Sequence, residues 1–236
     1  MSDYEVKRIL YFRRPGPHNT DNVIRAAKRR AKAAADVKYV VVASITGRTA
    51  LRVAEELKKS GIIVVCVSGF AGWDTYHGIE YPFVKGDIRK RLEELNVPLV
   101  DKMPSCLSGD TIDYGLARYG YIPASWTVAE TLEAVGGYGL KTAVEVVLMA
   151  TDSGTVPPSV SVISIAGTDR GADTAIVAKA AYSSLMFSQD SSKRFQVTEI
   201  IAMPRTKNWY KTVRVAELVV KETEEGDVLR SANESS

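Results

Sequence analysis

Hydroxyl and cationic side chains follow an apolar run near residue 40, where a helix is expected to begin. The segment reads Ser44-Ile45-Thr46-Gly47-Arg48-Thr49-Ala50. A helix N-terminus carries unpaired backbone N–H groups and the positive end of the helix dipole, which together favour an anion. Hydroxyl and guanidinium donors would strengthen that contact, and glycine would let a phosphate approach the backbone. This pattern predicts a phosphate-binding loop, whose expected contacts are Ser44, Thr46, Gly47, Arg48 and Thr49.

Simple helix capping is the alternative interpretation of this loop. The hydroxyl of Thr46, placed at the N-cap, would satisfy part of the helix start. Capping leaves Arg48 unexplained, because a cation in the first helical turn opposes the helix dipole. A bound anion would remove this conflict, and we therefore favour phosphate binding.

A second loop of similar character reads Gly167-Thr168-Asp169-Arg170-Gly171-Ala172-Asp173-Thr174. We expect it to follow a buried strand over residues 160–166 and to start a small-residue helix over 172–186. Ligands of open α/β sheets bind beyond the carboxyl ends of strands, so both loops are expected to face one site. The second loop would contribute Gly167, Thr168, Arg170 and Gly171. Asp173 would either stabilise the start of that helix or accept a hydrogen bond from a ligand hydroxyl.

A long loop over residues 68–86 carries several glycines and aromatic side chains. A loop of this length in a compact domain is more often functional than idle. Its aromatic residues, Phe70 among them, would either cover a flat ring or pack the loop against the domain. His77 is the candidate acid–base residue by type, with a plain surface position as the alternative. The two histidines and two cysteines of the chain lack the spacing of a metal site, so we expect no bound metal.

The elements that position these loops alternate along the chain. Apolar runs predict buried strands over residues 6–12, 39–43 and 62–67, with one-sided apolar helices between them. This alternation predicts right-handed crossovers and a parallel sheet in an α/β domain. Further strands are expected over 97–100, 196–202 and 212–220, and helices over 87–95, 109–119, 127–135 and 140–150. We expect one domain over residues 1–221 and a polar, frayed tail over 222–236.

Composition and charge limit the partners of the chain. Its 236 residues carry a net charge of +3, which is too small to indicate nucleic acid. Arginine and lysine crowd the helix expected after residue 19; we interpret them as a solvated helix face, with nucleic acid as the weaker alternative. The sequence shows no signal-peptide pattern and no apolar run of membrane-spanning length. We expect a cytoplasmic protein without membrane contact that binds a small-molecule phosphate ligand, and leave open whether it forms a homo-oligomer.

The loop at residues 44–50 resembles a loop in the C-terminal domain of pyruvate kinase. That domain has a buried strand, a Thr-x-Ser-Gly-Arg-Ser/Thr-Ala loop and a helix, and the loop holds the phosphate of an allosteric sugar bisphosphate. Most of the chain between residues 40 and 175 resembles a group of stand-alone archaeal proteins with the same domain fold. The segments that carry this resemblance are residues 44–50, 69–72, 107–109, 130–154 and 167–174.

The resemblance implies a three-layer α/β/α sandwich with a mostly parallel sheet, the pyruvate kinase C-terminal domain-like fold. It also implies flavin mononucleotide (FMN) as the cofactor, bound through the two loops described above, but it identifies no catalytic residue. Pyruvate kinase activity is not implied, because its (β/α)₈ barrel alone needs roughly 200 residues. We favour a flavin- or nucleotide-binding protein; if flavin binds, the enzyme version is a small oxidoreductase in which the cofactor carries the redox chemistry. The alternative is a non-catalytic sensor of a phosphorylated metabolite, so whether the chain is an enzyme stays open.

Overall fold

The computed structural model describes residues 3–34, 36–73, 75–76, 78–107, 111–112 and 119–207. Within these residues, a seven-stranded sheet with the order β1-β9-β8-β7-β2-β3-β6 forms the centre of the molecule. Several expectations concern segments outside the described residues. These are the strand over 212–220, the tail over 222–236, most of the helix over 109–119, and His77.

The sheet is mixed and mostly parallel. β2 (Val37–Ala43) pairs in parallel with β3 (Ile63–Val67) on one side and with β7 (Ser161–Ala166) on the other. The other parallel pairs are β3 with β6 (Leu99–Val100) and β1 (Leu10–Phe12) with β9 (Gln196–Pro204). β8 (Thr174–Lys179) runs antiparallel to both of its neighbours, β7 and β9. A separate short hairpin joins β4 (Thr75–Tyr76) to β5 (Ile79–Glu80).

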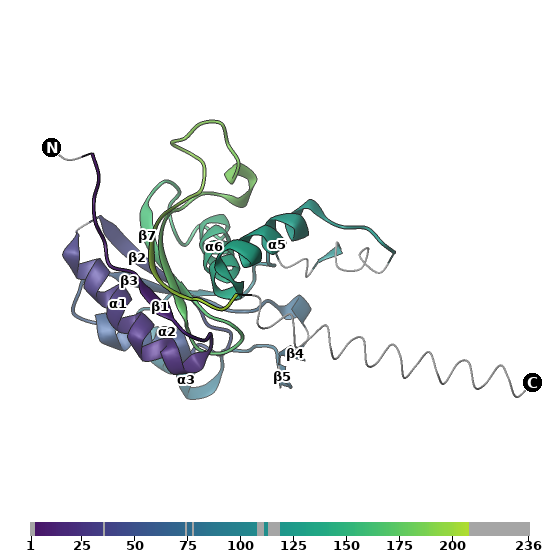
Figure 1. Cartoon of the computed structure of the whole chain (residues 1–236). Coiled ribbons are helices and arrows are strands. Elements are labelled where there is room, and N and C mark those ends of the chain that lie inside the picture. The colour runs from purple at the N-terminus through teal and green to yellow at the C-terminus, as the bar shows by residue number, and fades with distance from the viewer. Residues whose placement is uncertain are drawn as a thin grey trace, which may run out of the picture.

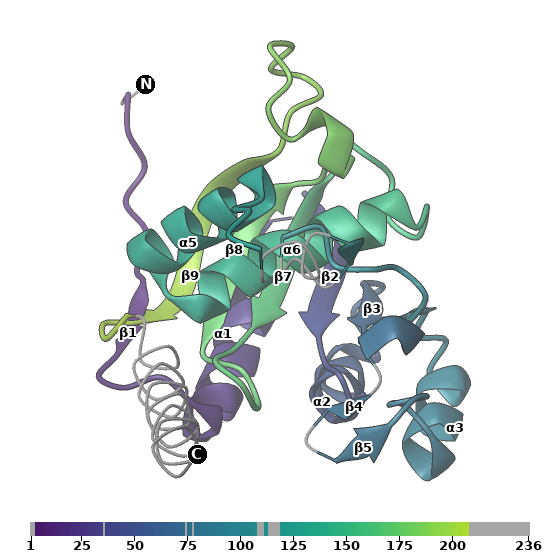
Figure 2. The ribbon, with the colours of Figure 1, turned by 90° about the vertical axis from the view of Figure 1, so that its right-hand side faces the viewer.

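Helices cover both faces of the sheet (Figures 1 and 2). α1 (Thr20–Ala33), α2 (Arg48–Leu57) and α3 (Gly86–Glu94) lie on one face, and α5 (Ala124–Gly136) and α6 (Tyr138–Asp152) lie on the other. Short 3₁₀ turns span Pro17–Asn19, Ala71–Trp73 and Ser183–Leu185. The expected α/β class is confirmed. In the described part of the chain, every helix is too short or too polar to cross a bilayer.

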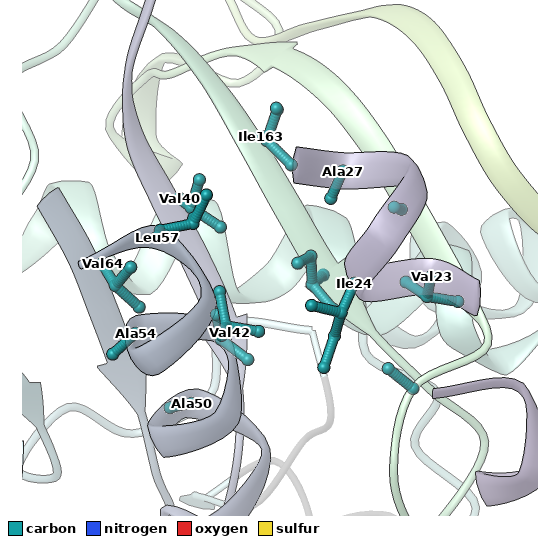
Figure 3. Close-up of a cluster of buried hydrophobic side chains, with 14 of the residues drawn as sticks. Val23, Ile24, Ala27, Val40, Val42, Ala50, Ala54, Leu57, Val64 and Ile163 are labelled. Carbon is teal, nitrogen blue, oxygen red and sulfur yellow. The ribbon is translucent and has the colours of Figure 1, made fainter. Parts of the chain in front are cut away.

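Apolar side chains of α1 and α2 meet over β2 on the first face of the sheet (Figure 3). The residues involved are Val23, Ile24 and Ala27 of α1, Ala50, Ala54 and Leu57 of α2, and Val40 and Val42 of β2. Val41 belongs to a second buried cluster, which includes much of α6. β2 is therefore apolar on both faces, as predicted for a central strand of a parallel sheet.

The helix expected over residues 172–186 is wrong, because residues 174–179 form β8 between β7 and β9. Alanine has the highest helix propensity, which is why the small residues of this segment suggested a helix. Pairing with two neighbouring strands outweighs that propensity. The β-branched Ile176 and Val177 suit a pleated sheet, and the small Ala175 and Ala178 are fully buried between the sheet and the helical layers.

The direction of the strand order changes at β2. The chain leaves β2 through α2 towards β3, and it reaches β7, on the other side of β2, from α6 on the opposite face. A switch of this kind opens a crevice beyond the carboxyl ends of the two strands. The loops that follow β2 and β7 both begin at this crevice.

Candidate functional site

A cavity of about 470 Å³ lies beyond the carboxyl ends of β2, β3 and β7. Its walls come from the β2–α2 loop (residues 44–47), the start of α2, the segment after β3, the β7–β8 hairpin loop (residues 167–173) and α6. Among the residues expected at the site, those that line the cavity are Ser44, Thr46, Arg48, Thr49, Phe70, Gly167, Arg170 and Gly171. The other two, Gly47 and Thr168, are not part of the lining.

The β2–α2 loop leaves backbone donors unpaired at the start of α2. The cap comes from Ser44, whose Oγ accepts hydrogen bonds from the N–H groups of Thr49 (3.1 Å) and Ala50 (3.3 Å). Capping by Thr46 is thus not observed. Within the described residues, the backbone N–H groups of Ile45, Thr46 and Arg48 donate to no protein acceptor, and all three residues line the cavity. The loop therefore presents donors for an external anion.

The end of β3 fixes the shape of this loop. The N–H of Ser44 donates to the carbonyl of Val67 at 2.9 Å, and the Ser68 hydroxyl donates to the carbonyl of Ile45 at 2.5 Å. The free N–H groups are thus held in place before any ligand arrives. Such preorganisation lowers the entropy that binding would otherwise cost.

Gly47 serves the packing of the loop and not the approach of a ligand. Its φ of +78° lies in the left-handed region. A Cβ at this position would lie 2.8 Å from Ile88 and 3.0 Å from Leu92, both on α3. The missing side chain would therefore point into the protein, which corrects the reason we expected for this glycine.

The β7–β8 hairpin loop does not begin a helix, so its expected helix dipole is absent. Asp173 is fully buried, and its Oδ2 accepts hydrogen bonds from the N–H groups of Gly16 (2.9 Å) and Thr168 (3.1 Å). Its Oδ1 accepts from the hydroxyl of Thr174 at 2.9 Å. Asp173 therefore has neither of the two roles considered for it. It ties the hairpin loop to the segment before α1, while Arg170 remains on the cavity wall.

The opposite wall of the cavity contains charged residues that we did not expect. Lys141 and Glu145 of α6 are buried, and Lys141 Nζ lies 3.3 Å from Glu145 Oε2 and 4.5 Å from the ring centre of Tyr138. Glu145 Oε1 accepts hydrogen bonds from the Ser105 hydroxyl and, at 3.2 Å, from the Leu107 N–H. Burial alone would lower the pKa of Lys141, but the negative groups around it, Glu145 first and then Tyr138 and Glu133, together outweigh burial and raise this pKa. Lys141 is therefore an ammonium at neutral pH.

Aromatic side chains of the segment after β3 reach the cavity from a third side. Phe70 and Trp73 both line it. Trp73 also packs edge-on against Phe83, with ring centres 6.3 Å apart. An edge-on contact of this kind fixes the orientation of the indole. The two interpretations of these aromatics are thus compatible, because Trp73 packs the segment down and still faces the cavity.

Two of the cations of α1 pair with carboxylates. Lys28 pairs with Glu56 at 2.6 Å, and Arg30 pairs with Glu199 at 2.7 Å. Groups of both signs also line the shallow groove between α1 and α2. This mixture of charges suits a solvated helix face better than a surface for a polyanion.

The sheet and its cavity define an α/β protein with a ligand-sized crevice at a switch point of strand order. No protein-family model matches the chain.

Proposed function

We propose that the chain binds a small molecule through a phosphate group placed at the start of α2. The observation that carries this proposal is the set of unpaired N–H groups of Ile45, Thr46 and Arg48 on the cavity wall. The hydroxyl of Thr46 and the exposed guanidinium of Arg48 add donors, and Arg170 faces the same space from the hairpin loop. A helix start, hydroxyl groups and arginine together form a common kind of phosphate site.

FMN is the ligand that we propose for this site. A volume of about 470 Å³ lies within the usual range of cofactor cavities. The cavity offers aromatic surface for a flat ring from Phe70, Trp73 and Tyr138. Apolar side chains such as Met149 also line it. Bound FMN would supply redox chemistry to a small oxidoreductase. The chain would hold the phosphate, orient the ring and exclude water from it.

A non-catalytic sensor of a phosphorylated metabolite is the second candidate. Arg48 and Arg170 approach the cavity from two different loops, an arrangement that suits a ligand with two anionic groups. A sugar bisphosphate is the natural probe for this alternative. Visible absorbance of the purified protein would support the flavin, whereas tight bisphosphate binding by a colourless protein would support the sensor.

The experiment is a titration with FMN, followed by quenching of flavin fluorescence. Arg48→Ala should weaken FMN binding by about 10- to 150-fold, since a charge-assisted hydrogen bond contributes roughly 1.5–3 kcal/mol. Arg29→Ala is the control, because Arg29 is exposed on α1 outside the cavity. Equal FMN affinity in Arg48→Ala and the wild type would contradict phosphate binding at α2.

A further inference from the structure

The buried charges of α6 stand out from the rest of that helix. Its other buried side chains are largely apolar and include Leu140, Val144, Val147 and Leu148. Lys141 and Glu145 are only 3% and 5% exposed, yet both line the cavity. We call these two residues the α6 ion pair.

Stability does not explain a buried ion pair of this kind. Replacing such a pair by apolar residues of similar size is often neutral or stabilising, because the charges lose their hydration on burial. The α6 ion pair nevertheless has well-defined geometry. Glu145 accepts hydrogen bonds from Lys141, Ser105 and Leu107, and the ammonium of Lys141 lies against the ring of Tyr138. A fixed, water-poor cation on a cavity wall is typical of a group that recognises a ligand.

The position of the pair indicates which part of the ligand it meets. α2 and α6 lie on opposite faces of the sheet, so the cavity crosses the carboxyl edge of the sheet from one face to the other. A ligand whose phosphate lies at the start of α2 extends past the strand ends towards α6. Its far end then meets the ammonium of Lys141, which attracts the lone pairs of oxygen or nitrogen and repels another cation. The neighbouring Glu145 carboxylate already accepts hydrogen bonds on both of its oxygens.

We propose that Lys141, positioned by Glu145, binds the electron-rich edge of a heterocycle, a carbonyl oxygen or an unprotonated ring nitrogen, at the end of the ligand opposite the phosphate. This inference rests on the proposed function, because the phosphate at α2 sets the direction of the ligand. In FMN the matching group is the dione edge of the flavin ring. Lys141 then selects among phosphorylated molecules according to the polarity of their far end.

The test compares two ligands on two variants. FMN probes both ends of the cavity, whereas inorganic phosphate, measured by competition with FMN, probes only the α2 end. The double variant Lys141→Met/Glu145→Leu removes both members of the α6 ion pair at similar volume, so that neither is left buried without the other. Lys90→Met is the matched control, since Lys90 is an exposed lysine of α3 outside the cavity.

We expect the double variant to lose about 10- to 100-fold in FMN affinity while its affinity for inorganic phosphate stays within about twofold of wild type. Arg48→Ala should weaken both ligands. Unchanged FMN affinity in the double variant would overturn the inference about Lys141 and leave the proposed function standing. An equal loss of affinity for FMN and for phosphate would also overturn it, because such a loss would indicate general damage to the cavity. A wild-type protein that binds no FMN would overturn the proposed cofactor and this inference with it.

Folding of the double variant is checked by near-UV circular dichroism and thermal unfolding. If it does not fold, Lys141→Gln/Glu145→Gln removes both charges and keeps an amide oxygen that can accept from Ser105 and Leu107. That variant should weaken FMN by about tenfold and leave phosphate binding unchanged. Wild-type FMN affinity in this folded variant would overturn the inference equally.

Discussion

Removal of the Asp173 carboxylate should destabilise the fold strongly. Asp173 is fully buried and accepts hydrogen bonds from two backbone N–H groups, of Gly16 and Thr168, and from the hydroxyl of Thr174. In Asp173→Ala both N–H groups lose their acceptor in a place that water does not reach. Each buried, unsatisfied donor costs about 1–3 kcal/mol, so we expect the free energy of unfolding to fall by about 4 kcal/mol.

Asp173→Asn separates the loss of charge from the loss of the acceptor. The amide oxygen can still accept from both backbone N–H groups, and the amide nitrogen can donate to the hydroxyl of Thr174. Only the charge assistance disappears, so the cost should be about 1–2 kcal/mol. Urea denaturation at pH 7, with equal m-values, measures both variants. A loss below about 1 kcal/mol in Asp173→Ala, or equal losses in the two variants, would refute this account of the hairpin loop.

Three further predictions concern other parts of the molecule. Gly47→Ala should lower the free energy of unfolding by at least about 1 kcal/mol more than Gly61→Ala, as measured by thermal unfolding. Both glycines have positive φ, but of the two only Gly47 has neighbours within 4 Å of an added Cβ. Equal losses of stability in the two variants would contradict the clash at Gly47. The hydrogen bond from Arg30 lowers the pKa of Glu199, so Glu199 stabilises the fold above its ordinary pKa of 4.5 and this contribution disappears as pH falls. The difference in free energy of unfolding between wild type and Glu199→Gln should therefore narrow as the pH falls from 7 to below 4.5, and a constant difference would contradict the ion pair. Burial raises the pKa of the Cys66 thiol to about 12. A thiol reagent at pH 8 should therefore label this residue only after denaturation. Rapid labelling of Cys66 in the folded protein would contradict this burial.

The strongly periodic elements could be predicted from the sequence. β2 and β3 are continuous apolar runs, and α2 ends close to Gly61, which marks a helix stop. The local order of residues around Arg48 also located a helix start with unpaired donors. These features depend on neighbours in the sequence, which is why they could be inferred without a structure.

Features that depend on distant partners could not be predicted. The alanine-rich segment of β8 becomes a strand because β7 and β9 pair with it from both sides, and neither pairing is visible in the segment itself. The same holds for Asp173, whose partner Gly16 lies far away in the sequence. A propensity of a few tenths of a kcal/mol per residue cannot compete with a full set of sheet hydrogen bonds and burial on two faces.

The α6 ion pair was overlooked although the sequence contained a signal for it. Lys141 and Glu145 are spaced i, i+4 inside a helix whose other residues are mostly apolar. That spacing places both side chains on one face of the helix. A charged pair within a helix that is apolar on all sides indicates either a buried ion pair or a cavity, and here both are present.

The pairing of β1 with β9 has a consequence for synthesis on the ribosome. Leu10 lies opposite Ala202 and Phe12 opposite Pro204, so among the described strands β1 has its partner only after β9 has been made. At roughly 5–20 residues per second, β1 waits on the order of ten seconds or more with its edge unpaired. The hairpin loop beside the cavity is made after the β2–α2 loop and after α6, so a nascent chain has its complete ligand site only once residue 171 has been added.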